Sequence, residues 1–185
     1  MVLKESASQT AGPYVHIGCV PSFAGLEDMY GGVDPGSVMV TGEPAGRRIA
    51  FTGAVFDGEG APLCDALIEV WQADGQGNHG PSNGFTGWGR QPSDGGTGAF
   101  RFDTIKPGAV DGQAPHLSLW IVARGINLGL HTRAYFDDEA EANAADSVLR
   151  LAGERAGTMI ARTTPEGFHM DIYLQGDNET VFLDV

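Results

Sequence analysis

Apolar and polar residues alternate along several short segments of this chain, as they do in strands that bury one face. Residues 49–56 place Ile49, Phe51 and Val55 on one side, and the turn-forming run 57–60 follows. Further strands are predicted at 66–72, 99–102, 117–123, 130–136, around 168–174, and at 180–185. Residues 49–56 and 66–72 are expected to be strands joined by a turn, and β-structure dominates the chain.

One segment has helical periodicity. Residues 137–151 begin with acidic side chains and place Ala140, Ala144, Val148 and Leu151 on one face, with Gly153 available as a cap. Residues 74–98 are rich in glycine and lack periodicity, which indicates a long exposed loop. The predicted fold class is therefore all-β: a two-layer, mostly antiparallel β-sandwich with one short helical insertion.

The pattern is different before residue 47. Residues 6–46 are rich in Gly, Pro and Ser and show no sustained period, which predicts an extended arm with loops. The arm nevertheless carries apolar side chains such as Tyr14 and Phe23, so we expect it to pack against a second chain. No repeat or linker divides the chain, and we expect a single domain over 1–185, with the arm at 1–46 and the sandwich at 47–185.

Composition narrows the possible partners. Among 185 residues, 24 are Asp or Glu and 11 are Lys or Arg, so the formal net charge is −13. Such a chain lacks the basic face that nucleic acids and anionic membranes require. The first residues carry no apolar run typical of a signal peptide, and Cys19 and Cys64 show no metal-ligand spacing. We expect a cytoplasmic protein with reduced thiols and no membrane segment.

Common catalytic motifs are absent: there is no phosphate-binding glycine loop, no nucleophile elbow and no His-Glu-x-x-His. The five histidines, which include His79 and His116, never stand at ligand spacing from one another, so a metal site would have to combine distant strands. The acidic residues at 137–139 have a structural explanation at the start of a helix.

Arg133 is the most informative single cation. It lies on a predicted strand between His131 and Tyr135, on the same alternating face as both. In so acidic a chain, Arg133 either pairs with a nearby carboxylate or holds the carboxylate of a substrate. The spacing alone leaves both interpretations open.

Six blocks, in order from residue 8 to the C-terminus, resemble the intradiol ring-cleaving dioxygenase family. They are S-Q-T-A-G-P-Y at 8–14, A-L-I-E-V-W-Q-A-D at 66–74, F-D-T-I-K-P-G at 102–108, A-P-H-L at 114–117, R-G-I-N-L-G-L-H-T-R at 124–133 and G-D-N-E-T-V-F-L-D-V at 176–185. The resemblance implies a β-sandwich that takes part in cleaving a catechol with O2 at a non-haem Fe(III). The implied substrate is protocatechuate and the product 3-carboxy-cis,cis-muconate.

The family's metal-bearing chains use two Tyr and two His, the histidines as a His-x-His pair. At the matching positions this chain has His79, then Ala109-Val110-Asp111 without a Tyr, then His116-Leu117-Ser118 with one imidazole. Both phenolates, the hard ligands that favour Fe(III), are absent. The resemblance therefore implies no metal ligands and no complete catalytic set here, with Fe(III) held by a homologous, iron-bearing partner chain.

The resemblance also implies a role at the interface with that partner. Thr10, Gly12, Pro13 and Arg133 are expected to line the substrate cavity, with Tyr14 a weaker candidate, and the heterodimer is expected to assemble into larger symmetric shells. Ordinary interface packing is the alternative for the arm residues. His116 is expected to be a buried structural histidine in a vestigial pocket, and metal binding is its alternative. Two other functions remain open: a non-enzymatic binding or structural module, and a self-contained metalloenzyme using His79, His116 and a carboxylate.

Overall fold

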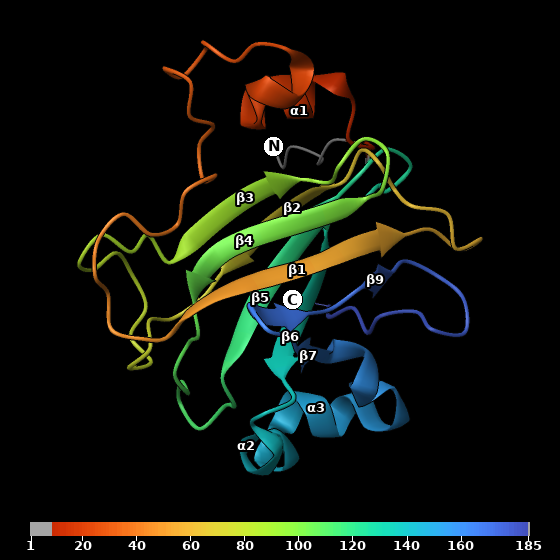
Figure 1. The fold of residues 1–185 in the computed structure, drawn as a ribbon. Helices are drawn as coiled ribbons and strands as arrows, with labels where there is room; N and C mark the ends of the chain where they lie inside the picture. The colour runs from red at the N-terminus through yellow and green to blue at the C-terminus, as the bar shows by residue number, and fades with distance from the viewer. Residues whose placement is uncertain (1–8, 185) are drawn as a thin grey trace, which may run out of the picture.

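The computed structural model describes residues 9–184 (Figure 1). Within them the chain forms one curled sheet, flanked by a helical N-terminal segment and a helical insertion. In chain order the elements are α1 Pro13–Cys19, η1 Pro21–Ala24, β1 Arg48–Phe56, β2 Leu67–Trp71, β3 Trp88–Pro92, β4 Ala99–Ile105, β5 His116–Val122, β6 Leu130–Phe136, α2 Ala140–Ala145, α3 Ser147–Ala152, η2 Gly153–Met159, β7 Ile160–Thr163, β8 Gly167–His169 and β9 Ile172–Tyr173. No helix among these described elements is long and apolar enough to cross a membrane.

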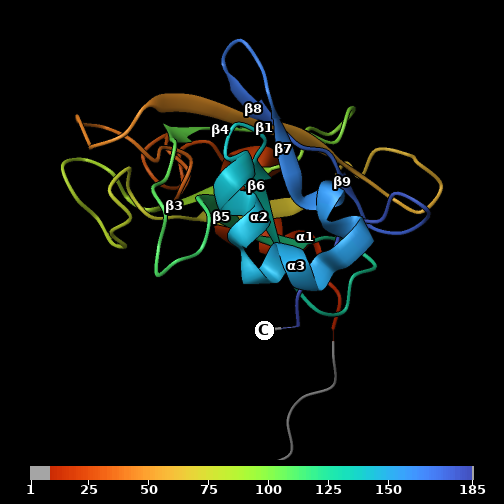
Figure 2. The ribbon, with the colours of Figure 1, turned by 90° about the horizontal axis from the view of Figure 1, so that it is seen from below.

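The strand order is β3-β2-β5-β6-β7-β8-β1-β4, with β9 pairing β1. Antiparallel ladders join β2 to β3 and β5, β5 to β6, and β1 to β4, whereas β7 joins β6 in parallel and β8 antiparallel. Seen from below, β1, β4 and β8 lie along one side of the sheet and β3, β5 and β6 along the other (Figure 2). The fold is mostly β, as predicted, but the continuous sheet does not confirm two separate layers.

The core lies between the two sides of this curl. Phe51 of β1 and Phe102 of β4 pack in one cluster with Ile68 of β2 and Leu119 of β5, all of them 0–1% exposed. These residues occupy the apolar positions of alternating segments, which explains why the pattern located the strands. Side chains at the other positions face outward and remain available to build a site.

The predicted loop at 74–98 was wrong over one stretch, because it contains β3. Strand β3 pairs with β2 from Leu67↔Pro92 to Trp71↔Trp88. Its buried residue is Gly89, and there is no room at this position for a side chain against Met39 and Phe102. A strand whose buried face carries a glycine shows no apolar alternation, so the sequence pattern did not reveal it.

The predicted last strand at 180–185 was also wrong within the described residues; Val185 lies outside them, as do residues 1–8 of the predicted arm. The segment makes one isolated bridge, between His131 and Leu183. Thr180 is fully buried, and its hydroxyl accepts a hydrogen bond from the Tyr173 N–H at 3.0 Å. Individual bonds of this kind, rather than a ladder, hold the end of the chain.

The single helix predicted over 137–151 is two helices, α2 and α3, separated by Asp146. Asp146 has extended backbone angles, and its side chain accepts hydrogen bonds from the N–H groups of Val148 and Leu149. The break changes the buried face, because Leu149 is buried while Leu151 is 86% exposed. The acidic residues before α2 form ion pairs: Lys106 binds Asp138 at 2.8 Å and Glu139 at 2.5 Å.

The described part of the predicted extended arm contains α1 and η1. Pro13 occupies the first helical position of α1, where the backbone N–H has no partner within the helix, so the lack of an N–H in proline has no cost. The carbonyl of Cys19 accepts a hydrogen bond from Arg90 of β3 at 3.4 Å, which attaches the end of α1 to the sheet. Helix α1 lies at the opposite end of the molecule from α2 and α3 (Figure 1).

Gly53 of β1 lies close to the backbone of a neighbouring segment, and this contact predicts the effect of a substitution at Gly53. A Cβ at Gly53 of β1 would overlap the Met170 carbonyl and crowd the ring of Phe100. We expect Gly53→Ala to lower the free energy of unfolding by about 1–3 kcal/mol. Gly95→Ala is the matched control, because a Cβ there meets nothing. Urea unfolding of both variants checks this, and equal stability would contradict the packing.

Candidate functional site

The described arm residues line a cavity of about 520 Å³. Thr10 holds the start of the arm to the sheet: its hydroxyl accepts from the Gly125 N–H at 2.6 Å and donates weakly to the Ala123 carbonyl at 3.4 Å. Gly12 precedes α1 as its N-cap, Pro13 follows, and a Cβ at Gly12 would meet nothing within 4 Å. The structure thus brings Thr10, Gly12 and Pro13 together on one wall.

His16 closes the inner side of this cavity. It is 8% exposed, and its ring lies 4.6 Å from that of Phe23. Burial lowers the pKa of His16, while the charge of Asp65 and the backbone of Ala66 oppose the effect. Among the described residues its Nε2 atom has no hydrogen-bond partner. His16 was not singled out in the sequence, where it reads as an ordinary histidine of the arm.

Arg133 lies elsewhere, on the outward face of β6. Its Nη1 atom donates to Gln113 Oε1 at 2.7 Å and to the Tyr135 hydroxyl at 3.1 Å. Within residues 9–184 no carboxylate lies within ion-pair distance of Arg133, so the structure does not bear out the internal ion pair considered above. The guanidinium is half-buried and keeps its charge without a neutralising partner in the described chain.

Behind Arg133 lie two fully buried polar side chains. The Tyr135 hydroxyl donates to Asp146 Oδ1 at 3.1 Å, and both residues are 0% exposed. Burial raises the pKa of Tyr135 to about 12, against the lowering effect of Arg133, so the phenol stays protonated. Burial alone would raise the pKa of Asp146, but the N–H groups of Ala114, Leu149 and Val148, with the Tyr135 hydroxyl, hold it below its usual range.

The structure does not bring Arg133 into the arm cavity. Helix α1 does, however, border the outward face of the sheet, the same face on which Arg133 lies. Val15 and Cys19 of α1 line a second cavity, of about 460 Å³, together with Trp71, Trp120 and His131 on the outward side of the sheet. Ser118 also lines it and is the register partner of Arg133. The arm and the strand that carries Arg133 therefore border one continuous face.

The donor set near His116 does not fit Fe(III). The Nδ1–H of His116 donates to the Ala114 carbonyl at 2.8 Å, and burial lowers the pKa of His116. The centroid of the His116 ring lies 5.4 Å from that of Tyr135, which is a protonated phenol. The Tyr135 hydroxyl accepts a hydrogen bond from Arg133 and donates one to Asp146. Across residues 9–184 no group of three or more His, Cys, Asp or Glu is placed to hold a metal ion.

His79 is exposed in the loop before β3 and lies near enough to His116 for its charge to lower the pKa of His116, but the described residues bring no third His, Cys, Asp or Glu to the pair. The self-contained metalloenzyme considered above therefore gains no support from the described part of the chain. A single imidazole and a neutral phenol lack the anionic oxygens that Fe(III) favours, so these residues do not fit a catalytic iron.

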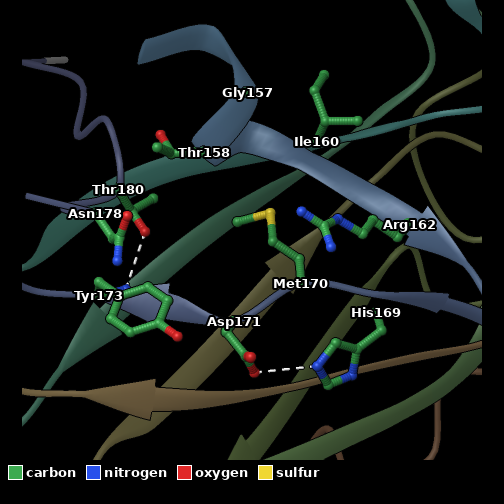
Figure 3. A pocket seen from close by; sticks show the side chains of 10 residues that line it. All are labelled: Gly157, Thr158, Ile160, Arg162, His169, Met170, Asp171, Tyr173, Asn178 and Thr180. Atoms are coloured by element: carbon green, nitrogen blue, oxygen red, sulfur yellow. Dashed lines mark hydrogen bonds and ion pairs between the residues drawn. The ribbon is translucent and has the colours of Figure 1, made fainter. Parts of the chain in front are cut away.

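A third cavity, of about 350 Å³, opens where β7, β8 and β9 meet (Figure 3). His169 Nε2 lies 3.1 Å from Asp171 Oδ1, and Arg162 and Tyr173 also line the space. The His169 Nδ1 atom lies 3.0 Å from the Thr52 hydroxyl. None of the residues predicted for the site lies here.

Sequence reasoning missed Gln113 and Asp146 and noted Tyr135 only as a neighbour of Arg133. The alternation of β6 already places Arg133 and Tyr135 on one face. Asp146, followed by Ser147 and an apolar run, has the pattern of a helix N-cap, which was obscured by the longer periodic segment around it. Nothing in the sequence pattern points to Gln113, because its contact spans 20 positions.

Comparison with known proteins places the chain among dioxygenases. The family model Dioxygenase_C, described as "Dioxygenase", matches residues 31–155. The protocatechuate 3,4-dioxygenase alpha chain of Pseudomonas putida is 40% identical, over 99% of this chain and 98% of its own length. The beta chain of the same enzyme from Burkholderia cepacia is 34% identical, over 75% of this chain and 69% of its own length.

A solved structure supports the fold. The dioxygenase domain of a dioxygenase carbohydrate-binding protein fusion from Streptomyces sp. SirexAA-E superposes with a TM-score of 0.60 at 28% identity. The match covers 83% of this chain and 97% of that domain. The curled sheet, the family match and the near full-length relatives agree, and the chain belongs to the intradiol ring-cleaving dioxygenase family.

Proposed function

We propose that this chain is the alpha-type subunit of a protocatechuate 3,4-dioxygenase, which cleaves protocatechuate with O2 to 3-carboxy-cis,cis-muconate in the breakdown of aromatic compounds. The observation that carries the proposal is the 40% identity to an alpha chain along 99% of this sequence. The lower, 34% identity to a beta chain over 75% of the sequence supports a homologous partner of that type.

In this proposal the non-haem Fe(III) belongs to the beta-type partner alone. Held there, it would supply the metal chemistry for ring opening with O2. The residues around His116 support this division, because they offer one imidazole, bonded through Nδ1 to a carbonyl, and a protonated phenol, and so include no anionic phenolate. This chain contributes the groups that bind and orient the substrate from the other side of the interface.

Arg133 would supply positive charge to the substrate cavity. Its guanidinium has no carboxylate partner among the described residues, although the chain carries 24 acidic side chains against 11 basic ones. In a cavity with little water, such a charge stabilises the substrate carboxylate and the carboxylates of the product far more than it would in bulk solvent.

The arm would complete the cavity. Thr10, Gly12 and Pro13 already share one wall, and Tyr14 beside them is 85% exposed. Large apolar side chains remain exposed along this part of the chain: Tyr14, Phe23, Leu26, Met29, Tyr30, Val33 and Val38, each 40% exposed or more. Exposed apolar surface of this kind is typical of a face that a partner covers.

Two finer points belong to the same proposal. The two sides of the curled sheet enclose a common core, which supports the two-layer sandwich as a description of the assembled subunit. The two free cysteines, Cys19 and Cys64, support a cytoplasmic location, where thiols stay reduced.

Replacing Arg133 tests the proposed charge. In the co-expressed complex we expect Arg133→Gln to reduce kcat/KM for protocatechuate by about 10- to 100-fold, the range for losing a hydrogen bond to a charged group. Iron content should not change. Arg150→Gln, at an exposed position of α3, is the matched control. Unchanged turnover in Arg133→Gln would favour a purely structural subunit.

Gly12 offers a separate test of the arm. Because a Cβ at Gly12 meets nothing among the described residues, Gly12→Ala should lower the stability of the isolated chain by no more than about 1 kcal/mol, the usual effect of Ala at an N-cap. In the complex the added methyl group would project into the shared cavity and raise KM for protocatechuate several-fold, about the effect of one misplaced methylene. Gly18→Ala, at an equally open position of α1, is the control. Identical kinetics for the two variants would remove Gly12 from the cavity wall.

A further inference from the structure

The buried network behind Arg133 is unusual for the outward face of a sheet. Two adjacent outward positions of β6, Arg133 and Tyr135, are linked to a carboxylate that is 0% exposed. Burying the carboxylate of Asp146 costs free energy unless hydrogen bonds compensate it. The groups that donate these hydrogen bonds are therefore held in fixed positions.

Asp146 binds one support of the Arg133 guanidinium, Tyr135, and the backbone beside the other support, Gln113. Its Oδ1 atom accepts from the Tyr135 hydroxyl, and Tyr135 in turn accepts from Arg133 Nη1. Its Oδ2 atom accepts from the Ala114 N–H at 3.0 Å, which fixes the backbone next to Gln113. Gln113 accepts the other Nη1 bond, and its own N–H donates to the Val110 carbonyl at 2.8 Å within a tight turn.

The two bonds from Nη1 use both protons of that nitrogen. A guanidinium has five N–H donors, so three remain, on Nη2 and Nε. Among the described residues these three donate to no protein acceptor. A planar fork fixed at one corner presents its remaining donors in one direction, which is the geometry for binding a carboxylate through two parallel bonds.

We propose that Tyr135, Gln113 and Asp146 are positioning residues that fix the Arg133 guanidinium so that its Nη2 and Nε donors meet the carboxylate of an aromatic substrate. The inference rests on the proposed function, because it requires that Arg133 reach the substrate. The residues act through Arg133 and touch neither substrate nor iron.

The fixed orientation makes the free energy of substrate binding more favourable, because an Arg side chain otherwise loses rotamer freedom when it binds a ligand. Holding Nη1 in advance removes part of that loss from the binding step. A loose guanidinium would still be attracted to the carboxylate, but its average geometry would be poorer and its affinity lower. The expected signature is therefore a higher KM with a smaller change in kcat.

The test is a double-mutant cycle on the full complex with its partner chain. Tyr135→Phe removes one hydroxyl and keeps the ring, while Asp146 retains three backbone donors, so the fold should persist. We expect Tyr135→Phe to raise KM for protocatechuate by about tenfold. In an Arg133→Gln background the same substitution should have no further effect, because the group it positions is already gone.

Controls separate positioning from stability. Tyr173→Phe removes a hydroxyl from a half-buried tyrosine that stacks on Phe56, remote from this network, and should leave KM unchanged. Thermal unfolding and iron content are measured for every variant. If Tyr135→Phe does not assemble, the same cycle is run with Gln113→Ala. This variant removes the other acceptor of Arg133 Nη1, at a residue that is only half-buried.

The outcomes are distinct. A KM effect of Tyr135→Phe that disappears in the Arg133→Gln background supports the inference. An unchanged KM, or an equal effect in both backgrounds, overturns the inference while the effect of Arg133→Gln alone still supports the proposed function. If Arg133→Gln itself has normal kinetics, the proposed role of Arg133 and the inference both fail.

Discussion

The carboxylate of Asp146 is the point at which the helical insertion, the sheet and the candidate site meet. Asp146 follows the last residue of α2, and its carboxylate caps α3 by accepting hydrogen bonds from the N–H groups of Val148 and Leu149. It also accepts from the Ala114 N–H before β5 and from the Tyr135 hydroxyl on β6. Four hydrogen bonds compensate the cost of burying this charge, and they join three segments that are distant in the sequence.

That constraint explains why Arg133 can stand half-buried without an ion pair in the described chain. Tyr135 and Gln113 satisfy two of its donors without neutralising it, so its charge remains available to an anion. Burial raises the pKa of Tyr135 to about 12 against the lowering effect of Arg133, so Tyr135 stays a neutral phenol. In one cluster the chain keeps a cation without an ion-pair partner among the described residues and lacks a phenolate, the kind of ligand that Fe(III) favours.

Much of the fold could be predicted from alternation, because residues such as Phe51, Phe102 and Leu119 bury one face of their strands. Strand β3 could not, since the residue that it buries is a glycine, Gly89. The helix break at Asp146 was hidden inside a segment with continuous periodicity, and the predicted apolar face therefore included the exposed Leu151. Arg133 was identifiable from its strand, whereas Gln113 is brought to it only by tertiary structure.

In the proposed enzyme the partner holds the iron, and this chain shapes the substrate cavity and gives it positive charge. The most direct measurement is the iron content of this chain purified alone, of the complex with its partner, and of a His116→Ala complex. The account predicts almost no iron in the isolated chain, and the same content, about one iron per heterodimer, in both complexes. Stoichiometric iron in the isolated chain, or loss of iron in the His116→Ala complex, would contradict it.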